Sequence, residues 1–338
     1  MKIIVIICIG LLLFSIAWIN KIDAQGCSYP TKIVSSDFPY IVDGWRRINL
    51  DWNEQSGAPV PLFYKPCGMA ILYMKEYNKV LFLCIDRDVY RIFGIVFVTD
   101  ENGKWQVQHN FVYGEYGRNA GQFSALSGMT SSALRMSSSY QFDPNEDYIF
   151  IADCGNNRIA KLGFNPTSNT LYWVGASGQN QLNNPRNVVY CTYGTPSKDD
   201  DDIFVADFGN DRLARFSKDG IFETSVGVEG NGSGEFFGIY GLAVGYPEGN
   251  YNSYIYCTDF HLGRASIYSS VPDGPLTLVR ELVIDDMRRS APTGITTAPN
   301  NEVYICDYHN NRIIKTNWDL TSITESIGEY GCDDEQFD

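Results

Sequence analysis

Two of the three histidines in this 338-residue chain occupy matching positions. His261 and His309 each stand two residues after an aspartate, in segments that are otherwise alike. Imidazole nitrogens are common zinc ligands, so two histidines on neighbouring loops could hold a zinc ion. The third ligand would have to be His109, which stands in a different sequence context. We therefore interpret His261 and His309 as surface turn residues and keep zinc as the alternative.

A second recurrent pattern is an aspartate followed five residues later by an arginine. The two residues flank a short turn between two β-rich runs, so the arginine can bind the aspartate across the neck of a hairpin in a charge-assisted contact. Because the pattern recurs, whereas a catalytic group would occur once, we expect a structural role. The four pairs are Asp153 with Arg158, Asp207 with Arg212, Asp259 with Arg264, and Asp307 with Arg312.

The most acidic stretch is CTYGTPSKDDDD at residues 191–202. Carboxylate oxygens are calcium ligands, but consecutive aspartates cannot all converge on one ion. We interpret this stretch as a solvated turn. The sequence contains no Gly-x-Ser-x-Gly or comparable nucleophile motif. We expect no cofactor, with zinc or calcium as alternatives. The lack of a catalytic motif favours a protein that is not an enzyme.

These residues belong to a unit that recurs along the chain. Each unit contains a Gly- or Asn-led apolar start, two β-rich runs joined by an Asn/Gly/Asp-rich turn, a further apolar run and a glycine-rich connector. The unit starts are Gly68, Gly128, Asn187, Gly241 and Gly294, separated by 60, 59, 54 and 53 residues. Apolar runs joined by such turns indicate β-hairpins. Repeats of this size predict an all-β propeller with four-stranded blades.

The units resemble NHL repeats, whose pattern runs roughly Pro-x-Gly-Ile-Ala-Val and then Ile-Tyr-Val-Ala-Asp-x-x-Asn-x-Arg-Ile. DIFVADFGNDRLARF (202–216) and EVYICDYHNNRIIKT (302–316) carry the pattern clearly, and LFLCIDRDVYRIF (81–93) carries it least. The resemblance implies an NHL-repeat propeller over residues 66–338. NHL-type propellers include peptidyl-hydroxyglycine amidating lyases, in which histidines bind zinc beside a catalytic tyrosine and arginine. A metal-dependent lyase is therefore the alternative function.

The N-terminal part of the chain lies outside these units. Residues 1–24 combine Met1-Lys2 with an apolar run from Ile3 to Ile19, which is typical of a secretory signal peptide, with a membrane anchor as the alternative. Residues 25–65 have about the size of a blade but show no hairpin signature. An open ring would leave an unpaired edge. We therefore expect six blades, the sixth built by residues 25–65, with a chain lacking its last blade as the alternative.

Export to an oxidising compartment would permit disulfides among the eight cysteines that follow residue 24. Cys332 lies in the last connector, and we expect it to pair with Cys27 or Cys67, which would join the two ends of the chain. Asn231 begins the one Asn-x-Ser/Thr sequon and is a candidate glycosylation site.

The chain is acidic, with a formal net charge of −14. Removing residues 1–24 takes away two lysines and one aspartate, which leaves 24 basic and 39 acidic residues, or −15. Binding to phosphate backbones requires clustered Lys and Arg, so we expect no nucleic-acid partner. We expect a secreted monomer, without membrane insertion after signal cleavage, that acts as a binding module for an extracellular protein, peptide or glycan.

Overall fold

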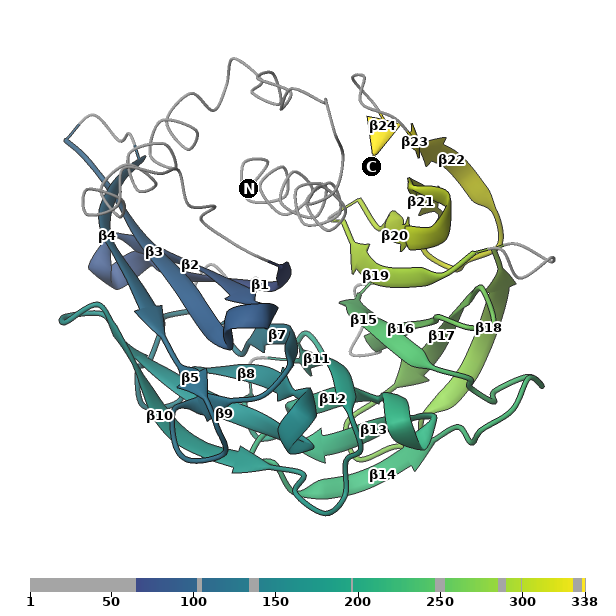
Figure 1. The fold of residues 1–338 in the computed structure, drawn as a ribbon, viewed down its shortest axis with the longest axis horizontal. Coiled ribbons are helices and arrows are strands. Elements are labelled where there is room, and N and C mark those ends of the chain that lie inside the picture. Colours follow the sequence, from purple (N-terminus) through teal and green to yellow (C-terminus); the bar gives the residue numbers. More distant parts are fainter. Residues whose placement is uncertain are drawn as a thin grey trace.

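The protein is a β-propeller built from consecutive four-stranded antiparallel sheets (Figure 1). The structure, a computed structural model, describes residues 65–101, 105–133, 140–195, 197–246, 253–284, 290–298, 300–330 and 336–337. Five such sheets occur within these residues, and the first strands of successive sheets lie side by side in the order β1, β7, β11, β15 and β19. We call the sheets blades 1 to 5.

The strands of each blade follow one another along the chain. Blade 1 contains β1 (Pro66–Met74), β2 (Lys79–Asp86), β3 (Arg91–Thr99) and β4 (Trp105–Tyr113). Blade 2 contains β7 (Leu126–Ser131), β8 (Tyr148–Asp153), β9 (Arg158–Asn165) and β10 (Thr170–Ser177). Blade 3 contains β11 (Pro185–Cys191), β12 (Asp202–Asp207), β13 (Arg212–Ser217) and β14 (Phe222–Val226). Blade 4 contains β15 (Ile239–Gly245), β16 (Ser253–Asp259), β17 (Arg264–Ser270) and β18 (Thr277–Val283). Blade 5 contains β19 (Pro292–Thr297), β20 (Val303–Asp307), β21 (Arg312–Thr316) and β22 (Ile323–Ile327).

One-turn 3-10 helices close most of the hairpins between second and third strands. They are η2 (Arg87–Val89), η3 (Cys154–Asn156), η4 (Phe208–Asn210) and η5 (Tyr308–Asn310), while η1 (Lys75–Tyr77) joins β1 to β2. The residue after η3, Asn157, has a φ of 52°, and the residue after η4, Asp211, has a φ of 47°. Asn and Asp tolerate this left-handed backbone, which explains why the turns are rich in them.

The connectors between blades are of two kinds. After blade 1, β5 (Glu115–Tyr116) pairs in parallel with β6 (Gln122–Phe123). After blade 5, β23 (Glu329–Tyr330) pairs with β24 (Gln336–Phe337) in the same way, and after blade 3 a single bridge joins Glu229 to Phe236. The connector after blade 2, from Gly178 to Asn184, is shorter and lacks such a pair. Long connectors therefore follow blades 1, 3 and 5.

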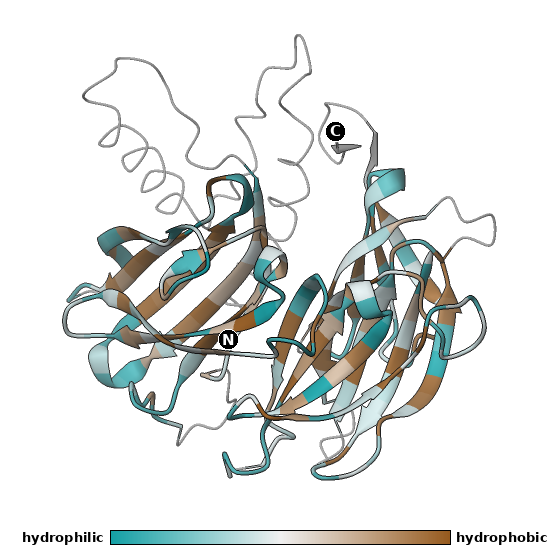
Figure 2. Ribbon diagram, turned by 60° about the horizontal axis from the view of Figure 1, so that its bottom comes forward, coloured by the Kyte–Doolittle hydropathy of each residue, from teal (hydrophilic) through white to brown (hydrophobic). Residues whose placement is uncertain are grey.

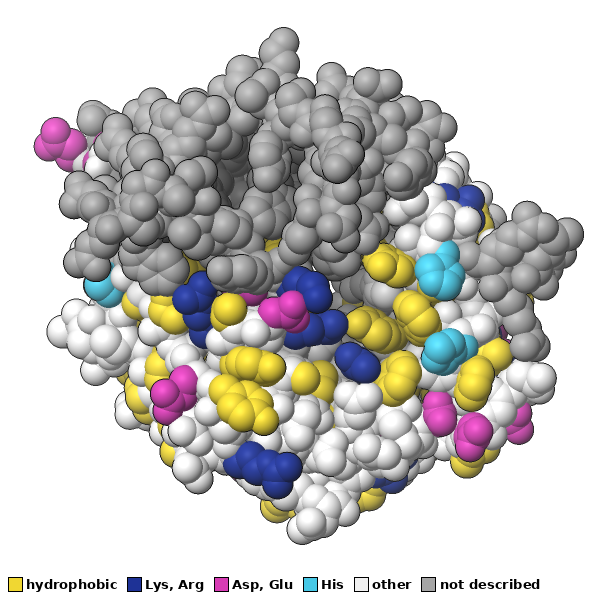
Figure 3. All heavy atoms as spheres, in the orientation of Figure 1, with side chains coloured by type: hydrophobic (Ala, Val, Ile, Leu, Met, Phe, Trp, Pro, Cys, Tyr) yellow, Lys and Arg dark blue, Asp and Glu magenta, His cyan; other side chains and the backbone are white. Residues whose placement is uncertain are grey.

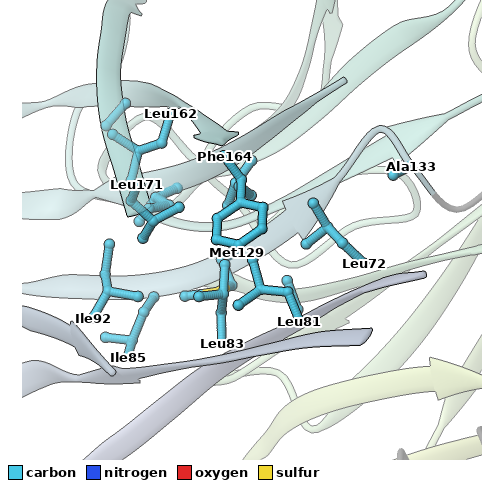
Figure 4. Close-up of a cluster of buried hydrophobic side chains, with 14 of the residues drawn as sticks. Leu72, Leu81, Leu83, Ile85, Ile92, Met129, Ala133, Leu162, Phe164 and Leu171 are labelled. Atoms are coloured by element: carbon cyan, nitrogen blue, oxygen red, sulfur yellow. The ribbon is translucent and has the colours of Figure 1, made fainter. Parts of the chain in front are cut away.

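The core lies between the faces of neighbouring blades, and hydrophobic residues run along the strands (Figure 2). Between blades 1 and 2, buried Leu72 and Leu83 meet Met129 and Phe164 (Figure 4). Burying such a side chain contributes roughly 1.5–3 kcal/mol relative to leaving it exposed. Equivalent clusters join blades 2 and 3, blades 3 and 4, and blades 4 and 5.

The expectation of six blades is wrong for the part of the chain that the structure describes, which forms five. Each blade takes all four of its strands from one continuous stretch, so none of the five needs a strand from the N-terminal segment. The predicted signal peptide at residues 1–24 and the segment 25–65, except for Lys65, lie outside the described residues. Within the described ranges, no helix is long and apolar enough to cross a membrane.

The acidic stretch 191–202 is only partly the solvated turn that we expected. Asp199 is exposed, but Asp202 is buried and accepts a hydrogen bond from the Tyr193 hydroxyl. Burial raises the pKa of the Asp202 carboxyl to about 6, and nearby Glu223 acts in the same direction, whereas Tyr193 and Arg215 oppose the increase. The last aspartate of the stretch is therefore part of the packed interior, because it begins strand β12.

We expect Asp202 to make stability depend on pH. The native carboxyl binds its proton more tightly than the unfolded chain does, so its stabilising contribution is complete below the ordinary value of 3.8 and is lost as pH rises through about 6. Asp202→Asn keeps the shape of the protonated form. Urea unfolding between about pH 4 and about pH 7 should show a shallower fall in stability for the variant. Identical pH profiles for the two proteins would contradict this expectation.

Candidate functional site

Two repeat positions place side chains at one end of the inner strands. The first is the bulge near the start of each inner strand, where the pairing with the second strand of the blade shifts register. A bulge of this kind changes the direction in which a side chain points. The second is the residue directly after the repeat aspartate, where the hairpin turn begins. The bulge residues are Cys67, Ser127, Arg186, Tyr240 and Thr293, and the turn residues are Arg87, Cys154, Phe208, Phe260 and Tyr308. We call these ten residues the mouth.

Arg87 shows that the mouth spans the centre of the propeller. Its Nε donates to the carbonyl of Leu126 at 3.2 Å, and its Nη2 donates to the Ser127 hydroxyl at 3.3 Å. The same Nη2 lies 3.4 Å from the hydroxyl of Tyr240. Arg87 belongs to blade 1 and Tyr240 to blade 4, and these blades are not neighbours in the order of inner strands. The contact therefore crosses the axis of the ring.

Arg186 differs from Arg87 because no protein group accepts its hydrogens among the described residues. Its guanidinium carbon lies 4.9 Å from the centre of the Phe208 ring and 5.6 Å from that of Tyr240. Its Nε is buried without a hydrogen-bond partner. Cation–π contacts compensate only part of the cost of burying a charged donor. Arg186 is thus a half-buried cation with free donors.

Aromatic and imidazole rings form one wall of the mouth. The ring of His261 lies 5.0 Å from those of Phe260 and Phe237, and the ring of His309 lies 5.8 Å from that of Phe260. Figure 3 shows histidine and hydrophobic side chains on this face beside a group of Lys and Arg. The structure therefore brings both sequence-predicted histidines to the same wall, where they pack against Phe260.

The histidines do not complete a metal site within the described chain. No group of three His, Cys, Asp or Glu side chains suited to a metal ion occurs there. His109 lies on β4, the outer strand of blade 1, with its ring 6.0 Å from that of Phe111. The residues that the structure describes therefore do not fit the three-ligand zinc centre considered from the sequence.

Two thiols line the mouth without being reactive. Burial raises the pKa of Cys67 to about 12 and that of Cys154 to about 11, so both stay protonated at neutral pH. Cys67 is a free thiol whose Sγ lies 3.4 Å from the carbonyl oxygen of Ser127. Cys67 forms no disulfide within the described residues, and its predicted pairing with Cys332 stays a prediction. The alternative partner Cys27, and Cys332 itself, lie outside the described residues.

The repeat aspartates fasten each connector to the blade that follows it. Asp153 Oδ1 accepts the backbone N–H of Ser124 at 2.8 Å, and Asp207 Oδ1 accepts that of Asn183 at 2.8 Å. The other oxygen of each aspartate accepts the arginine five residues later. The Nε–Oδ2 distances are 2.8 Å for Asp153 and Arg158, 2.7 Å for Asp207 and Arg212, and 2.9 Å for Asp307 and Arg312.

One predicted pair is arranged differently, and one pair was missed. Arg264 forms an ion pair with Glu281, with an Nη1–Oε1 distance of 3.1 Å. Asp259 accepts a hydrogen bond from the backbone N–H of Phe237 at 2.8 Å. Asp86 and Arg91 of blade 1 form a 3.7 Å ion pair with the same five-residue spacing. The spacing alone would have identified this fifth pair. Asn231, the sequon residue, is exposed in the long connector after blade 3.

Comparisons with known proteins concern the repeat and the fold. Residues 290–315 match the NHL repeat family. No curated protein matches the chain. Among solved structures, virginiamycin B lyase from Staphylococcus aureus is 14% identical over 77% of this chain and 68% of that chain, with a TM-score of 0.45. A putative gluconolactonase is 12% identical over 77% of each chain, with a TM-score of 0.46. The PQQ-bound aldose sugar dehydrogenase from Streptomyces coelicolor is 14% identical over 77% of this chain and 80% of that chain, with a TM-score of 0.44.

Proposed function

We propose that this NHL-repeat propeller is a secreted binding module whose mouth holds a carboxylate-bearing segment of an extracellular peptide or protein. The observation that carries the proposal is Arg186, a half-buried guanidinium whose donors lack an acceptor among the described residues. A guanidinium offers a planar fork of donors that matches a carboxylate. A ligand carboxylate would supply the acceptors that the protein does not.

The charge distribution supports the same ligand. The chain carries a net charge of −14, yet no described carboxylate pairs with Arg87 or Arg186. Asp88, which directly follows Arg87 in the turn, pairs instead with Lys65 at 2.9 Å. A net charge of −14 disfavours large polyanions such as nucleic acids, because their many charges would meet a protein of like charge. A single carboxylate avoids that repulsion.

The aromatic wall defines the remainder of the ligand. Phe208 and Tyr240 border Arg186, and Phe237 beside His261 is 48% exposed. An exposed ring next to a cation is suited to an apolar or aromatic group adjacent to the carboxylate. We therefore expect the mouth to prefer acidic residues that have an apolar neighbour.

The test uses fluorescein-labelled peptides in which aspartate or glutamate stands next to leucine or phenylalanine. Matched peptides carry asparagine or glutamine instead. We expect acidic peptides to bind and Arg186→Gln to weaken that binding at least about tenfold, since a hydrogen bond to a charged group contributes about 1.5–3 kcal/mol. Fluorescence anisotropy of the full chain measures the affinities.

The matched control is Lys75→Gln, which removes an exposed charge from η1 at the opposite end of the strands. It should leave the affinity unchanged. Equal affinity for acidic and amide peptides would show that the mouth does not recognise a carboxylate and would contradict the proposal. Equal weakening by both variants would show non-specific attraction rather than binding at the mouth.

A metal-dependent enzyme is the second candidate. The observation that favours it is the contact of Arg87 with Tyr240 at 3.4 Å, because tyrosine and arginine are the residue types that the resemblance to amidating lyases implies. Elemental analysis of the purified, folded protein tests this candidate. Stoichiometric zinc would support it, and a metal-free protein of full stability would exclude it.

A further inference from the structure

A second concave surface lies on blade 3, and none of the ten residues of the mouth lines it. It is a groove of about 700 Å³, within the size range of small-molecule sites. Three segments line it: the connector before blade 3, the hairpin and outer strand of blade 3, and the beginning of the connector after it. The lining residues are Asn180, Gln181, Asn210, Arg212, Phe222, Ser225, Gly227, Val228 and Glu229. We call it the connector groove.

The groove exists because the connector before blade 3 is short. In blade 2, the long connector covers Arg158, which donates to the carbonyls of Arg118 at 2.8 Å and Gln122 at 2.7 Å. In blade 4, Arg264 donates in the same way to the carbonyl of Gly232 at 2.9 Å. Arg212 of blade 3 donates to one carbonyl of its described connector, that of Gln181, at 2.6 Å. Its side chain is 23% exposed, against 8% for Arg158.

The polar groups of the groove can both donate and accept hydrogen bonds. The side chains of Asn180, Gln181, Ser225 and Glu229 have no hydrogen-bond partner in the part of the chain that the structure describes. They comprise two amides, one hydroxyl and one carboxylate. Sugar hydroxyls also donate and accept, so each of these groups can bind one. Val228, which is 62% exposed, offers an apolar surface for the C–H face of a sugar ring.

The charges of the groove favour a neutral ligand. Arg212 is paired with Asp207 at 2.7 Å, which leaves Glu229 as the uncompensated charge. A sulfated or sialylated ligand would meet like charge there, whereas a neutral ligand would not. We propose that the connector groove binds a short neutral oligosaccharide, independently of the ligand at the mouth.

The experiment screens the full chain against an array of neutral oligosaccharides with gluco-, manno-, galacto- and N-acetylglucosamine units, together with sialylated and sulfated glycans. Isothermal titration then measures the affinity of the strongest neutral binder. We expect Gln181→Ala and Glu229→Ala each to weaken binding at least about fivefold, the usual effect of removing one hydrogen bond. Asp219→Ala, an exposed change in another turn of blade 3, should leave the affinity unchanged.

The outcomes separate the groove from the mouth. The proposal is supported if Gln181→Ala and Glu229→Ala lose affinity for the neutral oligosaccharide while Arg186→Gln keeps it. The same loss in Arg186→Gln assigns the glycan to the mouth and overturns it. Preference for the charged glycans, or no neutral binder at millimolar concentration, also overturns it. Thermal unfolding of each variant verifies that a lost affinity does not reflect a lost fold.

Discussion

Replacing Gly241 with alanine is expected to destabilise the propeller by about 1–3 kcal/mol or more, the usual cost of overpacking a close contact. Gly241 lies in inner strand β15, where a Cβ atom would stand 2.1 Å from the carbonyl oxygen of Thr293 in the inner strand of blade 5. That oxygen belongs to a backbone, so a whole strand would have to move. The Thr258 hydroxyl, which accepts the N–H of Gly241 at 2.7 Å and donates to Thr293 at 3.1 Å, would move too.

Gly175→Ala is the matched control for this prediction. Gly175 lies in outer strand β10, and its added Cβ would meet no atom within 4 Å. We expect an effect within about 0.5 kcal/mol, as for other surface substitutions. Urea unfolding of the two variants gives the comparison. Similar midpoints would show that the inner strands can separate without cost, contrary to the packing of blades 4 and 5.

Replacing Asp207 with alanine should destabilise the protein by about 1–3 kcal/mol, because three donors would lose the buried carboxylate that accepts their hydrogen bonds. Asp207 is fully buried and accepts hydrogen bonds from Asn183 N, Asn210 Nδ2 and Arg212 Nε, at 2.8, 2.8 and 2.7 Å. The loss would free the connector before blade 3 and leave the Arg212 guanidinium without its carboxylate. The effect is therefore both on stability and on the shape of the connector groove.

Asp219→Ala is the appropriate comparison, since its carboxylate is 65% exposed and lies 3.7 Å from Lys218. A surface ion pair of this kind contributes about 0–1 kcal/mol. Asp200, a half-buried aspartate of the acidic stretch, is less suitable because it accepts a hydrogen bond from Thr195 at 2.9 Å. Equal unfolding midpoints for Asp207→Ala and Asp219→Ala would remove the structural role assigned to the repeat aspartates.

The blade was predictable from the sequence because its interactions are local. The hairpin of Asp207 and Arg212 closes within six residues, and its register follows from an alternating apolar pattern and a turn of suitable residues. The same holds for blade 5, which includes most of the residues that match the NHL repeat. Repetition made these signals stronger than a single hairpin would have been.

The mouth was only partly predictable. His261 and His309 were identified by their repeat position, and the structure places both against Phe260. Arg87 and Arg186 were not identified, although each also occupies a repeat position. Comparing the residue after each aspartate, and the residue at each inner-strand bulge, would have singled out the arginines as departures from the repeat.

What the sequence by itself determined is the repeating unit: four strands, a hairpin turn and an aspartate that can bind the arginine five residues later. These depend on residues close together in the chain, so they follow from local pattern and hydrogen-bonding chemistry. The tertiary structure alone decided which repeats face one another. Tyr240 meets Arg87 although 153 residues separate them, because the packing of blade against blade brings their strand ends to one axis. It also decided that Arg186 has no acceptor among the described residues. That property depends on the side chains from several blades that surround Arg186, so no local sequence pattern predicts it.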